Sequence, residues 1–139
     1  MKQKTVLFLC TGNSCRSQMA EAIVNSRLNE DWIAFSAGTK PAGTVHPLAI
    51  QVLAELGIEH RGNSKGVVEV RGIPFDLVIT VCDSAAEECP VWLGRGKRAH
   101  HSFPDPAKAE GTDEEIMDVF RAVRDDLEKE VVQLLKSFS

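Results

Sequence analysis

The sequence has no tyrosine, few aromatic residues of any kind and no long apolar run. Aromatic residues make up 6% of its 139 positions. No apolar stretch approaches the ~20 residues that a membrane-spanning helix needs, so we expect no association with a membrane. Basic residues are not in excess either: 16 Lys and Arg stand against 20 Asp and Glu, for a net charge of −4. Domains that bind nucleic acid normally present a basic face, so we expect no nucleic-acid partner.

Secretory signals, internal repeats, low-complexity tracts and linkers are also missing. The first residues, MKQK, lead into a short apolar run without the small-residue cleavage site of a signal peptide. We therefore expect a cytoplasmic protein. A hydrophobic fraction of 43% with 26% charged residues is typical of a soluble globular chain, and the length fits one domain. The sequence thus predicts a single-domain monomer over residues 1–139.

Four cysteines occur as two pairs, Cys10 with Cys15 and Cys82 with Cys89. In a reducing cytosol, cysteines seldom form structural disulfides; they bind metal, react, or lie in the core. Structural zinc sites usually place about two to four residues between paired ligands. Four residues separate the first pair here and six the second. This spacing disfavours a zinc site, and we expect no metal. Redox chemistry and burial in the core remain as alternatives for these thiols.

Short apolar runs alternate with segments of helix-forming composition, which predicts an α/β domain with a central parallel sheet. We expect strands at residues 5–9, 32–36 and 76–81, and helices at residues 17–28, 47–56 and from 112 onward. In such sheets the functional site forms beyond the carboxyl ends of the strands. Cys10 and Cys82 each follow a predicted strand, so we expect the two thiols to converge there.

The last helix has the clearest pattern. Thr112 and Glu115 fit a capping box at its start. Its apolar face is predicted to comprise Ile116, Phe120, Val123, Leu127, Val131 and Leu134. Residues 94–97 (GRGK) are predicted to form an exposed turn, to which we assign no function.

The segment between the first strand and the first helix, CTGNSCRS, has the features of an oxyanion-binding loop. Cys10 and Arg16 are separated by five residues that include a glycine, so successive backbone N–H groups can turn toward an anion. The positive end of the helix and the planar guanidinium of Arg16 suit a tetrahedral oxyanion. The same field favours the Cys10 thiolate as a nucleophile, and the Ser17 hydroxyl can donate a hydrogen bond to it. The residues expected to bind the oxyanion are Thr11, Gly12, Asn13, Ser14, Cys15 and Arg16.

This loop resembles that of the low-molecular-weight protein tyrosine phosphatases and of the arsenate reductases built on the same fold. The resemblance extends over nearly the whole chain and implies a low-molecular-weight phosphatase-like sheet of about four strands flanked by helices. These families carry an acid on an Asp-Pro loop, and Asp105-Pro106 stands at the matching late position. By this resemblance Asp105 is the general acid that protonates a leaving oxygen. The alternative is an ordinary Asp-Pro turn.

The second cysteine pair separates a reductase from a phosphatase. The segment VCDSAAEECP, with Cys82 and Cys89, resembles the redox segment of thioredoxin-coupled arsenate reductases. Phosphatases of this fold usually carry an aromatic residue after Asp-Pro that helps hold phosphotyrosine, whereas this chain has Ala107. The resemblance therefore favours an arsenate reductase, an oxidoreductase with no bound cofactor and with thioredoxin as its electron donor.

The resemblance also implies a cascade of three thiols. Cys10 attacks arsenate, Cys82 attacks Cys10 and releases arsenite, and Cys89 then forms a disulfide with Cys82 that thioredoxin reduces. Phosphate and sulfate are the expected analogues of arsenate. One alternative is a low-molecular-weight protein tyrosine phosphatase, in which Cys82 and Cys89 are inert core thiols. Another is a thiol protein that binds a metal or arsenite without turnover. Glutaredoxin or a small thiol could also replace thioredoxin.

Some arsenate reductases of this family hold a potassium ion beside the nucleophile loop, with ligands from an asparagine, a serine and a Thr-x-Asp segment. Asn13 and Ser36 match the first two, but the third aligns with residues 64–66 and lacks the carboxylate. An ammonium nearby repels a cation, so we expect no potassium effect. Lys65 either takes the place of the ion by reaching Asn13 or lies solvated at the surface. For His60 we expect packing or a surface position.

Overall fold

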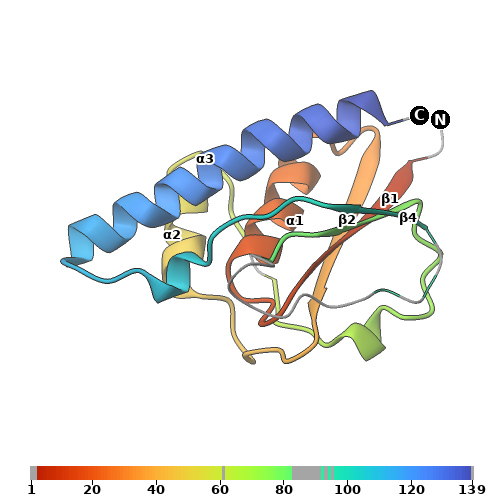
Figure 1. Cartoon of the computed structure of the whole chain (residues 1–139). Coiled ribbons are helices and arrows are strands. Elements are labelled where there is room, and N and C mark those ends of the chain that lie inside the picture. The colour runs from red at the N-terminus through yellow and green to blue at the C-terminus, as the bar shows by residue number, and fades with distance from the viewer. Residues whose placement is uncertain (1–2, 61, 83–91, 93, 95, 139) are drawn as a thin grey trace.

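A four-stranded parallel sheet forms the centre of the molecule (Figure 1). The computed structural model describes residues 3–60, 62–82, 92, 94 and 96–138. Within them the strands run in the order β2-β1-β3-β4 and pair in parallel throughout. Their bounds are β1 Lys4–Cys10, β2 Trp32–Gly38, β3 Leu77–Thr80 and β4 Lys97–His100. The predicted α/β class with a parallel sheet flanked by helices is therefore confirmed.

The first three strands form where apolar runs can be covered on both faces, as expected for a parallel sheet. In β1 every residue from Val6 to Cys10 is buried. The sheet of about four strands that the resemblance implied is confirmed, but the position of the fourth strand was not predicted, because its sequence, KRAH, is mostly exposed and has no apolar run. Charged residues on an edge strand discourage pairing with another molecule. The predicted turn over residues 94–97 is wrong at its last residue, because Lys97 begins β4 and pairs with Leu77.

Three α-helices lie in the described part of the chain, close to their predicted positions. They are α1 Arg16–Arg27, α2 Pro47–Ala54 and α3 Asp113–Ser137, with short 3-10 helices η1 Val67–Glu69 and η2 Pro106–Lys108. The capping box of α3 is confirmed: Glu115 N–H donates to the Thr112 hydroxyl at 3.1 Å, and Thr112 N–H donates to the Glu115 carboxylate at 3.2 Å. The apolar face of α3 ends at Leu135, which is buried, rather than at the predicted Leu134. A step of four residues from Val131 keeps that face aligned with the helical period.

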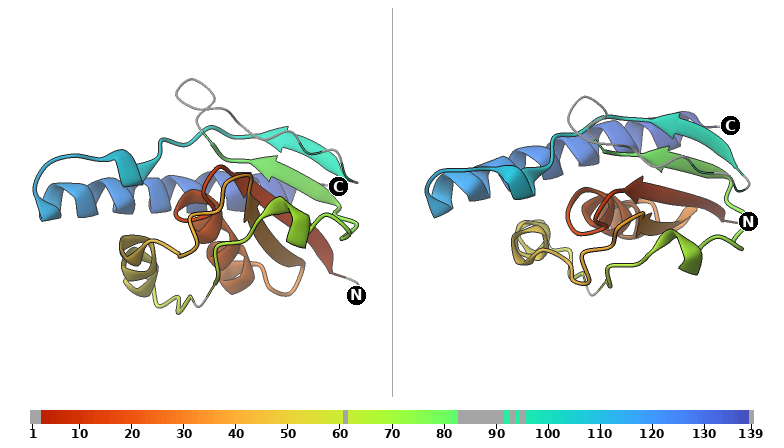
Figure 2. Two further views of the ribbon diagram at one scale, coloured as in Figure 1. Left: turned by 90° about the horizontal axis from the view of Figure 1, so that it is seen from below. Right: turned by 60° about the horizontal axis from the view of Figure 1, so that its bottom comes forward.

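The two faces of the sheet are covered differently (Figure 2). The three α-helices pack on the face that carries Val6 and Phe8. The opposite face, with Leu7 and Leu9, is covered by the segment around η1 and by Trp92. No helix among the described residues is long and apolar enough to cross a membrane.

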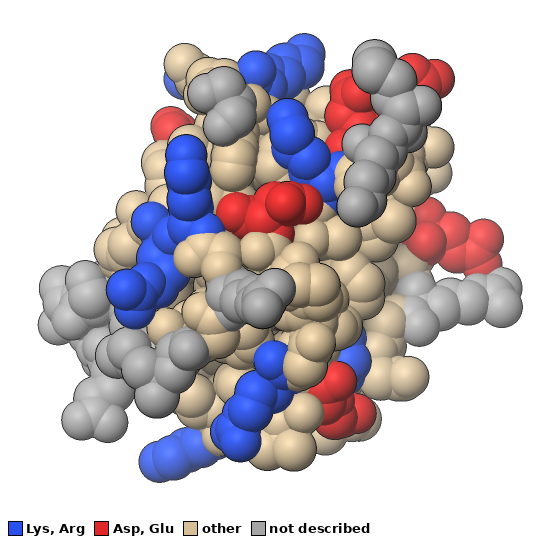
Figure 3. Space-filling view, turned by 90° about the vertical axis from the view of Figure 1, so that its right-hand side faces the viewer, with Lys and Arg blue, Asp and Glu red and all other residues tan. Residues whose placement is uncertain are grey.

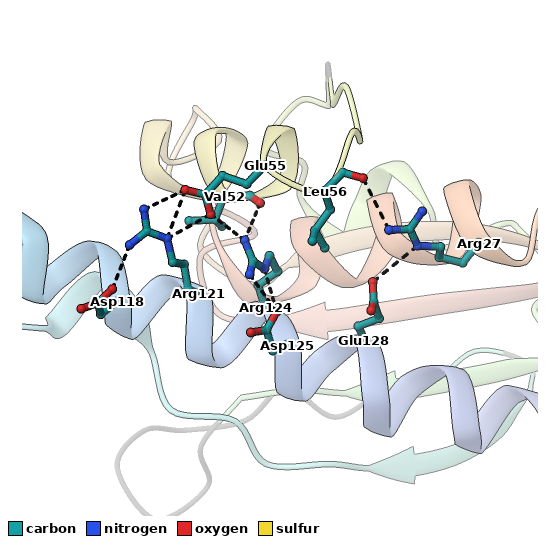
Figure 4. Close-up of polar contacts among 9 residues, drawn as sticks. All are labelled: Arg27, Val52, Glu55, Leu56, Asp118, Arg121, Arg124, Asp125 and Glu128. Atoms are coloured by element: carbon teal, nitrogen blue, oxygen red, sulfur yellow. Dashed lines mark hydrogen bonds and ion pairs between the residues drawn. The ribbon is translucent and has the colours of Figure 1, made fainter.

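Helix α3 is fixed to α2 by an ionic network, which we call the α2–α3 seam: Glu55, Asp118, Arg121 and Arg124, of which Arg124 is buried and the others are partly or fully exposed (Figure 4). Arg121 Nη2 lies 2.7 Å from Glu55 Oε2, and Arg124 Nη1 lies 2.7 Å from Glu55 Oε1. Hydrogen bonds from Arg121, and then from Arg124, lower the pKa of Glu55 to about 2. The seam thus depends on an ionised Glu55.

The far end of α3 is held by aromatic and cationic side chains at the amino-terminal edge of the sheet. Phe138 packs edge-on against Trp32 with ring centroids 5.5 Å apart. The ammonium groups of Lys4 and Lys97 lie 5.6 and 5.4 Å from the Phe138 ring, within the range of cation–π attraction. On the face seen in Figure 3, basic and acidic side chains are interspersed rather than gathered by sign.

Candidate active site

The loop after β1 lies at the point where the strand order reverses, because β2 follows on one side of β1 and β3 on the other. Open parallel sheets bind their ligands at such switch points, outside the carboxyl ends of the strands. Cys10 is the last residue of β1. Cys82 lies two residues beyond β3, whose Thr80 pairs with Leu9. Both sulfur-bearing residues, distant in sequence, therefore stand at the same edge on neighbouring strands, and both are buried.

The backbone of the loop is held from outside through its carbonyl groups. Three of them accept hydrogen bonds from the segment that follows β2: Thr11 from Lys40 N–H (2.9 Å), Gly12 from Ala42 N–H (2.9 Å) and Ser14 from His46 N–H (3.0 Å). In a planar trans peptide the next N–H points the opposite way, so these contacts turn the following N–H groups inward. Asn13 N–H shows the result, because it donates to Cys10 Sγ at 3.1 Å. Inward N–H groups suit an anion above the sulfur.

Two backbone positions allow this close packing. A Cβ atom on Gly38, at the end of β2, would lie 2.4 Å from the Thr11 carbonyl oxygen. Glycine is therefore required at position 38 for the loop to approach the strand. Asn13 has a φ of 49°, in the left-handed region that asparagine tolerates better than most residues.

The sulfur of Cys10 also shares a hydrogen bond with a side chain, that of Ser17. Ser17 Oγ lies 2.8 Å from Cys10 Sγ, and Asn13 Nδ2 donates to the same Ser17 oxygen at 2.8 Å. Because that oxygen already accepts a proton from Asn13, the Ser17 hydroxyl proton can be directed at the sulfur. The Asn13 N–H and the Ser17 hydroxyl thus both lie against the sulfur of Cys10, the predicted nucleophile.

The other thiol of the loop lies in the opposite kind of environment. Burial, with a further contribution from the Asp105 carboxylate, raises the pKa of Cys15 to about 12. A thiol with such a pKa stays protonated near neutral pH and is a poor nucleophile. The loop therefore contains one thiol supported by hydrogen-bond donors and one that is kept neutral.

Arg16 and Asp105 meet at the mouth of the loop. The guanidinium of Arg16 is buried; its Nη1 donates to the Phe103 carbonyl at 3.2 Å, and its Nη2 lies 3.7 Å from Asp105 Oδ2. Asp105 caps η2 by accepting the Ala107 N–H at 3.0 Å and is more exposed than Arg16. Helix α1 begins at Arg16 with no acidic residue in its first turn. The positive end of α1 and the Arg16 guanidinium therefore lie together, an arrangement that would favour an oxyanion.

Gln18 and His60 extend the site below the loop, and sequence reasoning had given neither of them a role there. Gln18 is fully buried, and its Nε2 donates to Asn13 Oδ1 at 2.8 Å and to the Asn63 carbonyl at 2.9 Å. His60 Nε2 lies 2.7 Å from Gln18 Oε1. Burial, and then the charge of Lys65, lower the pKa of His60. The sequence offers one signal for Gln18. It lies four residues before Ala22, so this polar side chain shares the buried face of α1.

The position of Lys65 differs from both predicted alternatives, which were an ammonium that reaches Asn13 and a solvated side chain at the surface. Its main-chain N–H, not its ammonium, reaches Asn13 Oδ1, at 2.7 Å. The ammonium donates to the Asn63 carbonyl at 2.9 Å and lies 3.8 Å from Glu21 Oε1, which also accepts the Ser36 hydroxyl at 3.1 Å. The positive charge beside Glu21 and Ser36 is therefore supplied by the protein. These residues do not fit a potassium ion, because the ammonium would repel it.

The state of the thiols is the remaining feature of the site. Cys10 and Cys15 are free thiols, whereas Cys82 is disulfide-bonded. Cys89, the third thiol of the predicted cascade, lies outside the described residues. Within the described residues there is no group of three or more His, Cys, Asp or Glu side chains that could hold a metal ion.

The chain is similar in sequence to known proteins. The family model for low molecular weight phosphotyrosine protein phosphatase matches residues 5–139. An arsenate reductase from Halalkalibacterium halodurans is 44% identical over 132 residues, which cover 94% of each chain. The resemblance that the loop and the cysteine segment indicated is thereby confirmed.

Solved structures agree with the sequence relatives. The crystal structure of an arsenate reductase from Archaeoglobus fulgidus has a TM-score of 0.80 and 31% identity, and the match covers 95% of this chain and 99% of that one. An arsenate reductase in its phosphate-binding state has a TM-score of 0.78 and 29% identity, covering 99% and 100% of the two chains. The low-molecular-weight phosphatase-like fold is therefore confirmed.

Proposed function

Because the chain belongs to the low-molecular-weight phosphotyrosine protein phosphatase family and the relatives described above are arsenate reductases, we propose that it reduces arsenate to arsenite. One observation carries the proposal. A cysteine that forms a disulfide, Cys82, stands at the same sheet edge as a free cysteine in an oxyanion-binding loop, Cys10. A phosphatase needs the loop, the arginine and the acid, but it has no use for a second redox-active thiol.

Arsenate binds in the loop as phosphate would, because the two anions share shape and charge. The inward N–H groups of residues 11–16 and the amino-terminal end of α1 surround its oxygen atoms. The guanidinium of Arg16 provides a planar pair of donors for two of them. The solved relative in a phosphate-binding state supports this mode of binding.

The chemistry begins at Cys10. Its thiolate attacks arsenic, an As–S bond forms and an As–O bond breaks. Asp105, whose Oδ2 lies 3.7 Å from Arg16 Nη2, gives a proton to the departing hydroxyl, which leaves as water. The product is a covalent adduct of arsenic(V) on the Cys10 sulfur.

Reduction follows by thiol exchange. The Cys82 thiolate attacks the Cys10 sulfur, the As–S bond breaks, and its electron pair stays on arsenic, so that arsenite leaves and a Cys10–Cys82 disulfide remains. Cys89 then attacks Cys82, which restores the Cys10 thiol. Cys82 is disulfide-bonded while Cys10 is free, as expected for the end of this sequence.

Thioredoxin is the proposed electron donor that reduces the final disulfide, with no cofactor bound to the reductase. The proposal includes a single-domain monomer over residues 1–139 that works in the reducing cytoplasm, where thiols are regenerated.

The test is arsenite release in the presence of thioredoxin, thioredoxin reductase and NADPH. Wild-type protein is expected to turn over, whereas Cys82→Ser and Cys89→Ser stop after a single round at most. Omitting thioredoxin, or replacing it with glutaredoxin or glutathione, identifies the donor. Full turnover by either variant contradicts the cascade. Rapid hydrolysis of an aryl phosphate without arsenate turnover would assign a phosphatase instead, and arsenite or zinc bound without turnover would assign a binding protein.

A further inference from the structure

Two charged side chains beside the nucleophile loop are not used by the reaction described above. Glu21 comes from α1 and Lys65 from the segment before η1. Lys65 Nζ lies 3.8 Å from Glu21 Oε1, and only 23% of the lysine side chain and 13% of the glutamate side chain are exposed. Removing two charges from water is costly, so a largely buried pair such as this one is weak evidence for a role in stability alone. Its position relative to Cys10 suggests a different role.

Lys65 connects this pair to the loop through its main chain. Its N–H donates to Asn13 Oδ1 at 2.7 Å, and its carbonyl accepts the Gly38 N–H at 2.9 Å. Ser64 adds a hydrogen bond from its hydroxyl to the Gly12 carbonyl at 3.0 Å. The segment that carries Lys65 is thus attached both to the end of β2 and to the loop.

The orientation of the Asn13 amide determines what reaches the nucleophile. Its oxygen accepts from Lys65 N–H and from Gln18 Nε2, which turns its Nδ2 toward Ser17 Oγ at 2.8 Å. A flipped amide would present its oxygen to Ser17 instead. The hydroxyl proton would then go to Asn13 and be lost to the Cys10 sulfur, 2.8 Å from Ser17 Oγ.

We propose that the Glu21–Lys65 pair positions the Cys10 nucleophile by fixing the Asn13 amide. The ion pair anchors the lysine side chain to α1, and the lysine main chain then holds the amide oxygen. Glu21 and Lys65 are positioning residues, since they act through Asn13 and Ser17 rather than on substrate. Burial raises the pKa of Glu21, and the charge of Lys65 followed by the Ser36 hydroxyl opposes this rise. The charge of Lys65 therefore supports the ionised form of Glu21.

The experiment measures the reactivity of Cys10 directly. In reduced protein without arsenate, the rate of iodoacetamide labelling of Cys10 is followed from pH 5 to 9 and assigned by mass spectrometry. The variants are Lys65→Met, Glu21→Gln, the double variant and Lys65→Arg. Lys129→Met, which removes an exposed lysine from α3, is the matched control. The kcat and KM for arsenate and the Tm are recorded for each.

Lys65→Met and Glu21→Gln are expected to move the labelling profile to higher pH and to slow labelling at pH 7 by about three- to tenfold, as for loss of one hydrogen bond. The kcat for arsenate is expected to fall together with the labelling rate, while KM stays nearly constant. The double variant matches the worse single variant because the two residues act as one unit. Lys65→Arg and Lys129→Met follow wild type.

A labelling profile of Lys65→Met that coincides with wild type overturns the inference, even if the Tm falls. So do single-variant effects that multiply in the double variant. The activity measurement rests on the proposed function, but the labelling measurement does not. A protein that releases no arsenite yet shows the expected labelling shifts would refute the function and support the positioning role.

Discussion

The nucleophile loop and the α2–α3 seam both depend on charged and polar groups, but they use them in opposite ways. In the loop, Arg16, Ser17 and Asn13 are buried and their contacts converge on one sulfur or its mouth. In the seam, the Glu55 carboxylate lies at the surface and connects two helices through the partly exposed Arg121 and the buried Arg124. Buried polar networks make large demands on geometry, whereas exposed ion pairs tolerate change. We therefore expect the loop to control activity and the seam to affect only stability.

Replacing the acid at the mouth of the loop should have the largest effect. Asp105→Asn removes the proposed proton donor but keeps the shape of the side chain, so we expect kcat for arsenate reduction to fall by about 10²- to 10⁴-fold. Iodoacetamide labelling of Cys10 should continue at the wild-type rate, because the nucleophile and its hydrogen bonds are untouched. Steady-state kinetics with Asp126→Asn, a surface carboxylate on α3, serve as the control. A kcat within threefold of wild type would remove Asp105 from the mechanism.

The close approach of the loop to β2 predicts an effect on both stability and activity. In Gly38→Ala the new Cβ would lie 2.4 Å from the Thr11 carbonyl, a backbone atom that cannot move alone. We expect a loss of about 1–3 kcal/mol of unfolding free energy, as for an overpacked site, together with a lower kcat. Gly72→Ala is the matched control, because nothing lies within 4 Å of a Cβ built there. Denaturant unfolding measures the difference. Equal unfolding free energies of Gly38→Ala and Gly72→Ala would mean that the loop does not approach β2 closely enough for a Cβ atom at position 38 to clash.

The sequence revealed the elements with a local pattern and missed those defined by distant neighbours. Buried strands, the capped α3 helix and the Cys10–Arg16 loop follow from local order along the chain. The resemblance implied a fourth strand, but its position could not be predicted from the residues, because the exposed edge strand β4 has no apolar signature and forms only through its pairing with β3. The role of Glu21 likewise depends on Lys65, which lies 44 positions away in a segment without regular structure.

The contribution of the seam to stability should depend on pH. Because the pKa of Glu55 is lowered to about 2 in the folded protein, its contribution to stability is present above its unfolded value of about 4.3. That contribution is lost as the pH falls toward 2. Glu55→Gln should therefore lower the Tm at neutral pH, and the difference from wild type should shrink as the pH is reduced.

Calorimetry between pH 2 and 7 measures this difference, with Glu110→Gln as an exposed control carboxylate. The kcat of Glu55→Gln should stay within about twofold of wild type, since surface ion pairs contribute little beyond their own contact. A Tm difference that persists undiminished at pH 2, or a large fall in kcat, would contradict the separation of roles between seam and loop.

The smallest expected effect is that of potassium. The Lys65 ammonium already supplies a positive charge beside Glu21 and Ser36, and two positive charges about 4 Å apart repel by roughly 4 kcal/mol at an effective dielectric constant of about 20. Activity and Tm should therefore be the same in potassium and in tetramethylammonium at equal ionic strength. In Lys65→Met the repulsion is gone while the oxygen atoms of Asn13, Glu21 and Ser36 remain. A rise in Tm with potassium in Lys65→Met alone would show that the ammonium excludes the ion. A rise in both the activity and the Tm of wild type would instead show that a cation site persists beside the lysine.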